Sequence, residues 1–272
     1  MRSLPLSLLL LFTVTAAWCR GDEFSEKGRE VFKKYRHSVV TVQIVVKSKI
    51  SMAGMGGQAN ETRQDVTGTL IDSSGLTVLS LAATDPAQMM QNFMSTDEDS
   101  KIKLETELSD VKILLEDGTE IPAEVVLRDK DLDLAFVRPK IKITAELTPL
   151  DLGKSAKVDV LDQVIALNRL GNAAGRAYAA SVERIAAVVE RPRLFYVPET
   201  SFTTTALGAP AFSLDGNVVG LFVMRALKSR GGGNGMMGMP AGNITGIIIP
   251  AEDILKAAKQ VPASSDQKKD QQ

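Results

Sequence analysis

The chain offers few of the side chains that hydrolases and metal sites use most. It contains one histidine, His37, and one cysteine, Cys19, among 272 residues. Histidine and cysteine supply many of the general bases, activated nucleophiles and zinc ligands found in proteins. A zinc site typically needs three or four ligands of such types, so we expect neither zinc nor another cofactor. Any catalysis would have to work within this shortage.

Methionine is the other residue type that gathers in a way that suggests chemistry. The clustered residues are Met52 and Met55 in the Gly-rich segment 52–57, and Met236, Met237 and Met239 in the segment 231–242. Thioether clusters of this kind bind Cu(I) in oxidising compartments. Methionine and glycine also fill flexible loops or form an adaptable apolar surface. We favour the second interpretation and expect both segments to be mobile loops rather than strands.

Short β-strand patterns must position whatever site the chain has. Nine segments are rich in Val, Ile, Leu and Thr and are bounded by Gly, Asp, Asn or Pro, which is typical of an all-β domain. These segments are 38–46, 67–72, 76–81, 111–115, 120–127, 132–137, 163–167, 218–223 and 244–249. Turns with glycine at 72–75, 116–119 and 214–217 predict hairpins, so sequential strands should be antiparallel.

Helical patterns lie near both ends of this β region. An amphipathic pattern over 25–36 leads into it, and Pro250 begins a closing helix over 251–260. Asp85-Pro86 followed by 87–94 predicts a further capped helix. The residues from Ala263 onward are small or polar and are expected to be disordered.

The order of the segments resembles the trypsin-like protease domain of the HtrA/Deg family. The stretches that carry the resemblance are Ser38-Val39-Val40-Thr41-Val42 for the opening strand, 68–76 for the first long hairpin, Asp133-Leu134-Ala135-Phe136-Val137 for the strand of the triad aspartate, 210–220 for the hairpin after the nucleophile, and Ile249-Pro250 for the close of the domain. The resemblance covers about Tyr35 to Val261. It implies two antiparallel six-stranded β-barrels of the chymotrypsin/trypsin type, with short N-terminal and C-terminal helices.

The resemblance, together with the patterns at the two ends of the chain, sets the expected division. The expected parts are a signal peptide at 1–19, an N-terminal helix at 20–37, a double-barrel domain at 38–262 with its first barrel at 38–140 and its second at 150–262, and a disordered tail at 263–272.

The catalytic positions implied by the resemblance hold unsuitable residue types. The general-base histidine falls on Ala82 and the serine nucleophile on Leu207. An alanine cannot accept a proton, and a leucine cannot attack a carbonyl. The oxyanion region falls on Thr205 and Gly208, with Thr205 in place of a turn glycine. Only Asp133 keeps its family identity. We therefore expect no catalytic residue, and we expect Asp133 to be a carboxylate tied to nearby backbone N–H groups.

Other hydroxyl groups near the expected cleft leave one alternative open. They belong to Ser80, Ser201, Thr203, Thr204 and Thr205. A hydroxyl is a weak nucleophile unless an adjacent group activates it, and no base is evident beside these residues. His37 lies at the junction of the first helix and the first strand, where its positive form would suit the end of the helix dipole.

The N-terminus has the form of an export signal. Arg2 precedes an apolar run over 4–14, and cleavage is expected after Ala17 or Cys19. The run is shorter than the ~20 residues that span a bilayer, so no membrane span should remain after cleavage. A mature chain without disulfides is more typical of a bacterial envelope than of animal secretion. The net charge of −1 and pI near 6.0 exclude nucleic acid as a partner.

These observations favour a secreted or periplasmic serine protease homologue without its catalytic His and Ser. We expect it to bind a peptide or protein segment in the cleft between the barrels, or to regulate a partner. The alternatives are a serine endopeptidase with an unconventional nucleophile, and a metal-binding or structural protein built on the methionine segments. The sequence does not define the oligomeric state.

Overall fold

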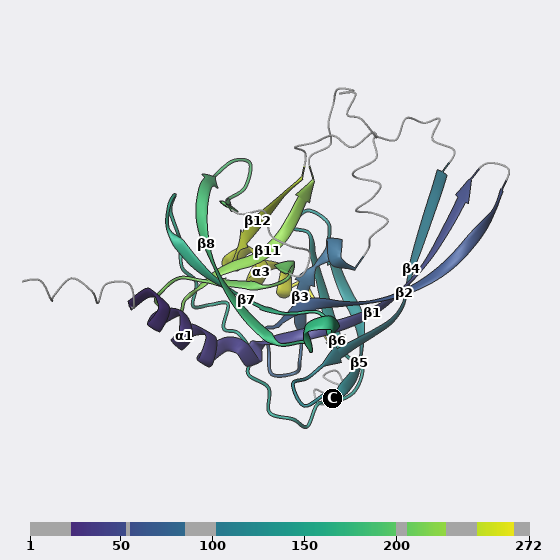
Figure 1. Ribbon diagram of the computed structural model, residues 1–272, viewed down its shortest axis with the longest axis horizontal. Coiled ribbons are helices and arrows are strands. Elements are labelled where there is room, and N and C mark those ends of the chain that lie inside the picture. Colours follow the sequence, from purple (N-terminus) through teal and green to yellow (C-terminus); the bar gives the residue numbers. More distant parts are fainter. Residues whose placement is uncertain (1–22, 53–54, 85–101, 200–205, 227–243, 264–272) are drawn as a thin grey trace, which may run out of the picture.

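Two closed β-barrels make up most of the structure, which is a computed structural model that describes residues 23–52, 55–84, 102–199, 206–226 and 244–263. Each barrel has six antiparallel strands (Figure 1). Helix α1 (Glu23–Tyr35) precedes the first barrel, and helix α3 (Ala251–Ala258) follows the second. The all-β, double-barrel architecture expected from the sequence is therefore confirmed.

The first barrel is closed in the order β1-β2-β3-β6-β5-β4. Its strands are β1 (Val39–Met52), β2 (Met55–Leu70), β3 (Thr77–Ser80), β4 (Ile102–Leu114), β5 (Glu120–Asp129) and β6 (Leu134–Pro139). Alternate residues of β1, Val40, Val42 and Ile44, are buried in its interior. Because successive side chains point to opposite faces, and Thr41 and Gln43 between them are buried as well, this stretch of β1 is covered on both faces.

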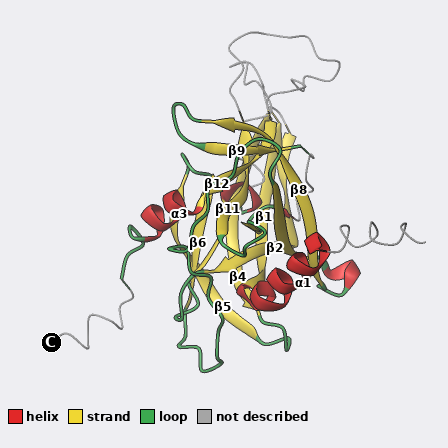
Figure 2. Cartoon of the chain, turned by 90° about the vertical axis from the view of Figure 1, so that its left-hand side faces the viewer, coloured by secondary structure: helices red, strands yellow, loops and turns green. Residues whose placement is uncertain are grey.

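The second barrel is closed in the order β10-β11-β12-β9-β8-β7. Its strands are β7 (Gln163–Arg169), β8 (Tyr178–Val189), β9 (Phe195–Pro198), β10 (Pro210–Phe212), β11 (Val218–Ala226) and β12 (Ile244–Pro250). Tyr196 and Phe222 are the largest side chains of its interior cluster. The cartoon in Figure 2 shows β8, β9, β11 and β12 of this barrel above helix α1.

Strands β1, β2 and β4 continue well beyond the predicted segments and form a three-stranded extension (Figure 1). The prediction of a loop over 52–57 is wrong, because β1 runs to Met52 and β2 starts at Met55, with these two residues paired. Met52 also pairs with Ile102 of β4. Backbone groups form the ladder, and residues of weak β-propensity supply them as well as Val or Ile do. The segments 87–94, 231–242 and the tail from 264 lie outside the described residues.

The three turns predicted from glycine are present. In the first, Asp72 Oδ1 accepts hydrogen bonds from the backbone N–H groups of Ser74 and Leu76, and Gly75 has φ 89°. A positive φ at this position is costly for residues with a Cβ, which explains the glycine. The turns at 116–119 and 214–217 likewise place Gly118 and Gly216 at positive φ.

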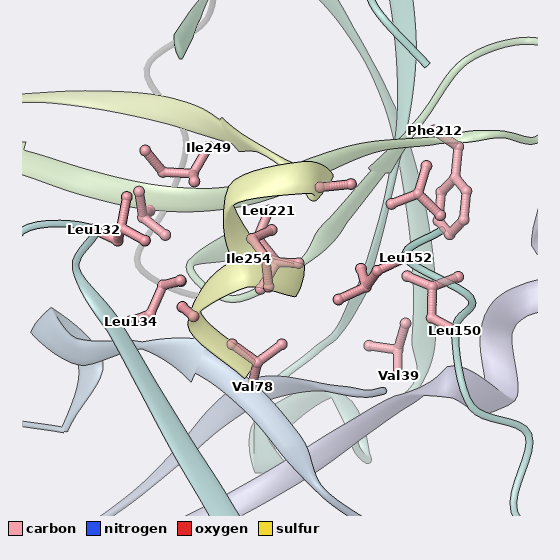
Figure 3. Close-up of a cluster of buried hydrophobic side chains, with 14 of the residues drawn as sticks. Val39, Val78, Leu132, Leu134, Leu150, Leu152, Phe212, Leu221, Ile249 and Ile254 are labelled. Carbon is pink, nitrogen blue, oxygen red and sulfur yellow. The ribbon is translucent and has the colours of Figure 1, made fainter. Parts of the chain in front are cut away.

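A shared apolar core joins the two barrels, and helix α3 lies within it (Figure 3). Val78 and Leu134 come from the first barrel, Phe212 and Leu221 come from the second, and Ile254 comes from α3. All five side chains are fully buried. The barrels are thus held together by the same kind of close packing that fills each of them.

Truncating Ile254 should weaken the contact between the barrels. Ile254 is 0% exposed, so Ile254→Ala would leave a cavity that both barrels line and should lower the free energy of unfolding by about 2–5 kcal/mol. Urea unfolding monitored by circular dichroism measures this. Lys256→Ala on the same helix is the control and should leave the free energy of unfolding close to that of the wild type, because the Lys256 side chain is exposed and an exposed ion pair contributes little. Equal effects of the two substitutions would contradict this account.

Candidate functional site

The turn before β6 places Asp133 at the boundary of the barrels. Asp133 has φ 56°, a conformation that asparagine and aspartate adopt more readily than most residues. Its backbone carbonyl accepts a hydrogen bond of 2.8 Å from the N–H of Leu81, which follows β3. The turn and the end of β3 are therefore fixed to each other before any side chain is considered.

Both carboxylate oxygens of Asp133 accept hydrogen bonds from the chain itself. Oδ1 accepts from the backbone N–H of Ala82 at 2.9 Å. Oδ2 accepts from the Ser80 hydroxyl at 2.5 Å and from the backbone N–H of Met224 in β11 at 3.1 Å. The Met224 bond crosses from the first barrel to the second. The carboxylate thus accepts from three donors, two of which are backbone N–H groups.

Opposing effects act on the pKa of the Asp133 carboxyl, and their balance is upward. Burial raises the pKa of Asp133 to about 6, while the hydrogen bonds from Ser80, Met224 and Ala82 act in the opposite direction. Removal from water outweighs the three donors, because desolvation penalises the charged form of an acid. A carboxyl group of this kind changes its protonation state near neutral pH.

Leu207 and Gly208 lie beside the same group. Leu207 is 2% exposed. Gly208 has φ 87°, and a Cβ built on it would lie 2.3 Å from the backbone oxygen of Thr67 and 3.3 Å from the backbone N of Ser80. Its N–H donates to the Phe222 carbonyl at 2.7 Å, and its carbonyl accepts from Thr69 Oγ1 at 2.9 Å. Only glycine fits so close an approach.

The structure therefore brings Ala82, Asp133 and the 207–208 segment to one place, although they are far apart in the sequence. Ala82 lies in the short helical turn η2 (Leu81–Ala83) and is partly exposed. Thr205, the other residue expected in the oxyanion region, lies outside the described residues, as do Ser201, Thr203 and Thr204. The Asp133–Ser80 bond was not predicted, because nothing in the sequence distinguishes Ser80 from other strand serines.

The geometry around Ser80 bears on its chemistry. Its side chain is 0% exposed and its hydroxyl is engaged by Asp133. A peptide carbonyl cannot reach a fully buried hydroxyl without a rearrangement of β3. Among the described residues, Ser80 supplies the one hydroxyl that donates to the Asp133 carboxylate.

His37 lies in a different group of residues. It sits in the turn η1 (Arg36–Ser38), where Nδ1 is 2.8 Å from Glu116 Oε2 and Nε2 accepts from Arg36 Nε at 3.1 Å. Its ring also meets the Tyr178 ring edge-on at 5.8 Å. These contacts join the N-terminal helix to one turn of the first barrel and one strand of the second. None of them involves the Asp133 group.

The structure describes only some of the methionines that were considered as metal ligands. Across the described ranges, no three His, Cys, Asp or Glu side chains are grouped to hold a metal ion. Met52 and Met55 are paired through their backbones at the ends of β1 and β2, and Met236, Met237 and Met239 lie outside the described residues.

Polar contacts from strand β2 also connect the two barrels. Arg176, in the loop before β8, pairs with Asp65 of β2 at 2.7 Å, and Gln43 of β1 donates to the other oxygen of Asp65 at 3.1 Å. Thr67 of β2 contacts the backbone of Arg169 in β7. Strand β2 thus carries a row of polar side chains that faces the second barrel.

Replacement of Asp133 should change how stability depends on pH. Because the pKa of Asp133 in the folded protein is about 6, above the ordinary 3.8, the folded state binds the proton more tightly than the unfolded chain. The stabilisation by protonation is fully present below about pH 4 and is lost as pH rises through about 6. From about pH 4 to 7.5 the wild type should lose up to about 3 kcal/mol more than Asp133→Asn.

Urea unfolding over this pH range measures the difference. Asp215→Asn, in an exposed turn, is the control and should keep the wild-type pH profile. Parallel profiles for the wild type and Asp133→Asn would show that the carboxyl group is not buried as described.

No helix among the described residues is both long enough and apolar enough to cross a membrane. The expected signal peptide at 1–19 lies outside the described residues.

Comparison with known proteins agrees with this fold. The family model of the trypsin-like peptidase domain matches residues 66–221, which is more than half of the chain. "Putative protease Do-like 14" of Arabidopsis thaliana is 28% identical over 187 residues, covering 66% of this chain and 39% of that protein. The chain therefore spans about two fifths of the length of this curated relative.

Solved structures of HtrA-type proteases share the fold. The HtrA-type protease AlgW with a decapeptide is 16% identical, with a TM-score of 0.54 over 86% of this chain and 67% of that chain. The same protease with a tripeptide is 15% identical, with a TM-score of 0.54 over 86% of this chain and 63% of that chain. At this identity the likeness concerns the fold alone. Taken with the match over residues 66–221, the two barrels show that this chain belongs to the trypsin-like peptidase domain family.

Proposed function

We propose that this protein is a non-catalytic member of the family, which binds a peptide or protein segment between its barrels or regulates a partner, and which acts after export from the cytoplasm. The observation that carries the proposal is the Asp133 carboxylate. In an active triad this carboxylate orients the imidazole of a histidine. Here the carboxylate accepts from Ser80, Ala82 and Met224, and His37, the one histidine of the sequence, makes its contacts elsewhere.

The residues beside the carboxylate support the same proposal. Ala82 has no group that could accept a proton, and the buried side chain of Leu207 cannot act as a nucleophile. Without a base and a nucleophile in reach of each other, the serine protease mechanism has no first step. Ser80 is the nearest hydroxyl, and its burial disfavours the alternative of an unconventional nucleophile.

Binding an extended peptide by strand addition needs a free strand edge. Strand β11 provides a candidate for this edge. The N–H of Phe222 donates to the carbonyl of Ala209, and its C=O accepts from the N–H of Gly208. The N–H of Met224 donates to Asp133. Because such groups alternate along an antiparallel strand, the C=O of Met224 and the N–H of Ala226 point the same way, toward the first barrel. Within the described residues, no strand pairs with this edge of β11 beyond Leu221. An extended peptide can add here.

The first test asks whether the protein cleaves anything. Purified wild type should neither degrade unfolded casein nor react with a fluorophosphonate probe. The double variant Ala82→His, Leu207→Ser should react weakly at most, because Ser80 still donates to the carboxylate that the new imidazole needs. Adding Ser80→Ala should raise probe labelling at least about tenfold, since a well-placed carboxylate contributes strongly to such catalysis.

The control is Asp133→Asn in the triple variant, which should remove the gained labelling. Casein cleavage by the wild type that disappears in Ser80→Ala would contradict the proposal and favour an endopeptidase. Cleavage that survives every one of these substitutions would point to a contaminating protease.

The second test asks whether the β11 edge binds an extended chain. Fluorescein-labelled, unfolded casein should bind the wild type, as measured by fluorescence anisotropy. Ala226→Pro removes the N–H that points toward the first barrel and should weaken this binding about tenfold, a loss of about 1.4 kcal/mol. Equal affinity of wild type and variant would contradict binding at this edge.

A further inference from the structure

A second strand edge lies on the opposite part of the second barrel, along β8. Residues Tyr178–Arg184 of β8 pair with β7 on one side. On the other side, β9 pairs with β8 only from Ile185 onward. Among the described residues, no strand lies beside the first six residues of β8. Within the part of the chain that the structure describes, this half of β8 is therefore paired with β7 alone.

The hydrogen-bond pattern fixes which backbone groups face away from β7. Ala177 accepts a bond from Leu170, and Ile185 donates to Asp162, so the odd-numbered residues of this stretch face β7. The alternation of an antiparallel pair then directs the N–H and C=O groups of Tyr178, Ala180 and Val182 outward. Arg184 follows the same pattern, because its carbonyl accepts from Glu199 on the β9 side. Donors and acceptors at two-residue spacing are what an added strand requires.

An apolar groove runs along this same stretch. It has a volume of about 410 Å³ and lies between helix α1 and strand β8. Phe24 and Phe32 of α1 form one wall, Ala180 and Val182 of β8 form the other, and the buried Ile165 of β7 lies at its base. Figures 1 and 2 show α1 passing close to β7 and β8. Apolar side chains therefore line the space beside the backbone groups of the edge.

Two details show that the groove is open rather than filled by the chain itself. Val182 is 48% exposed, which is unusual for a valine within a strand. Gly28 faces the groove from α1, and a Cβ built on it would lie 3.8 Å from Ile165 Cδ1, at an ordinary contact distance. A glycine in a helix interior costs stability, and here it leaves room between the helix and the sheet.

We propose that this groove and edge form a second docking site, which takes an extended polypeptide segment with apolar side chains at alternate positions. The segment adds as a strand beside Tyr178, Ala180 and Val182. Its alternate side chains enter the groove between α1 and β8. A ligand must both pair with the outward backbone groups and fill the apolar groove, and an extended chain can do both. A helix has no free backbone groups to pair with the edge. A small apolar molecule would leave the outward N–H groups without a partner in the ligand.

The proposal does not depend on the binding role proposed for β11. The two edges belong to different strands of the second barrel, and they share no lining residue. Each can be blocked by one proline that leaves the ladder on the paired side intact, because the lost N–H points away from the partner strand. These substitutions are Ala180→Pro for β8 and Ala226→Pro for β11.

The test uses the full chain and a fluorescein-labelled probe peptide, acetyl-Lys-Leu-Thr-Leu-Thr-Leu-Lys-amide, with anisotropy as the readout. We expect saturable binding that Ala180→Pro weakens at least tenfold. Val182→Asp should have the same effect, because it places a charge in the groove. Val160→Asp is the matched control, since Val160 is exposed to nearly the same extent, 47%, and should change affinity by less than twofold. A probe with threonine in place of leucine should bind at least tenfold more weakly.

A second measurement covers the case in which Ala180→Pro does not fold. Hydrogen exchange on the wild type should show the amides of Ala180 and Val182 slowed by the peptide, while the amide of Ala226 on the β11 edge stays unchanged. Absence of binding would overturn the proposal. Binding lost in Ala226→Pro and retained in Ala180→Pro would also overturn it, and would leave the β11 proposal standing. A wild-type dimer in sedimentation that Ala180→Pro dissociates would show that a second copy occupies the edge.

Discussion

The buried carboxylate of Asp133 is the interaction on which the arrangement of the site depends. It collects donors from the end of β3, from the turn η2 and from β11, and so connects both barrels at one point. Because burial raises the pKa of this group to about 6, its protonation is coupled to how the barrels meet. The surrounding contacts depend on the same alignment. Gly208 approaches the backbone of Thr67 so closely that no Cβ would fit between them.

The electrostatic contacts around Tyr178 form a second connection that is independent of Asp133. The guanidinium of Arg169 lies 4.1 Å from the centroid of the Tyr178 ring, and this arginine is only 8% exposed. His37 touches the edge of the same ring and pairs with Glu116. A buried cation is costly unless it is compensated, and here an aromatic face provides part of the compensation. Tyr178 also lines the groove beside α1, so this cluster borders the β8 edge.

Much of the fold could be predicted from the sequence, and the reasons for the errors are physical. The turns at 72–75, 116–119 and 214–217 were identifiable because glycine at positive φ leaves a clear signal. Strand β8 was missed because its first half, rich in Ala and Ser, is exposed and shows no apolar alternation. The extension of β1, β2 and β4 was missed because backbone pairing needs no distinctive side chain. At the site, the resemblance drew attention to Ala82, Asp133 and Leu207, and their equivalence to a triad stays a prediction. The role of Ser80 depends on a contact across 53 positions of sequence, which no local pattern encodes.

The position of helix α3 in the chain has a consequence for the order in which the protein is assembled during synthesis. Strands β1 to β6 are contiguous in the sequence, so the first barrel can close while later residues are still being made. Helix α3 follows the last strand of the second barrel, yet Ile254 packs in the core that both barrels share. Until that helix emerges, Val78, Leu134 and Leu221 lack a neighbour and expose apolar surface. A nascent chain of this protein therefore exposes apolar surface of the shared core until helix α3 docks.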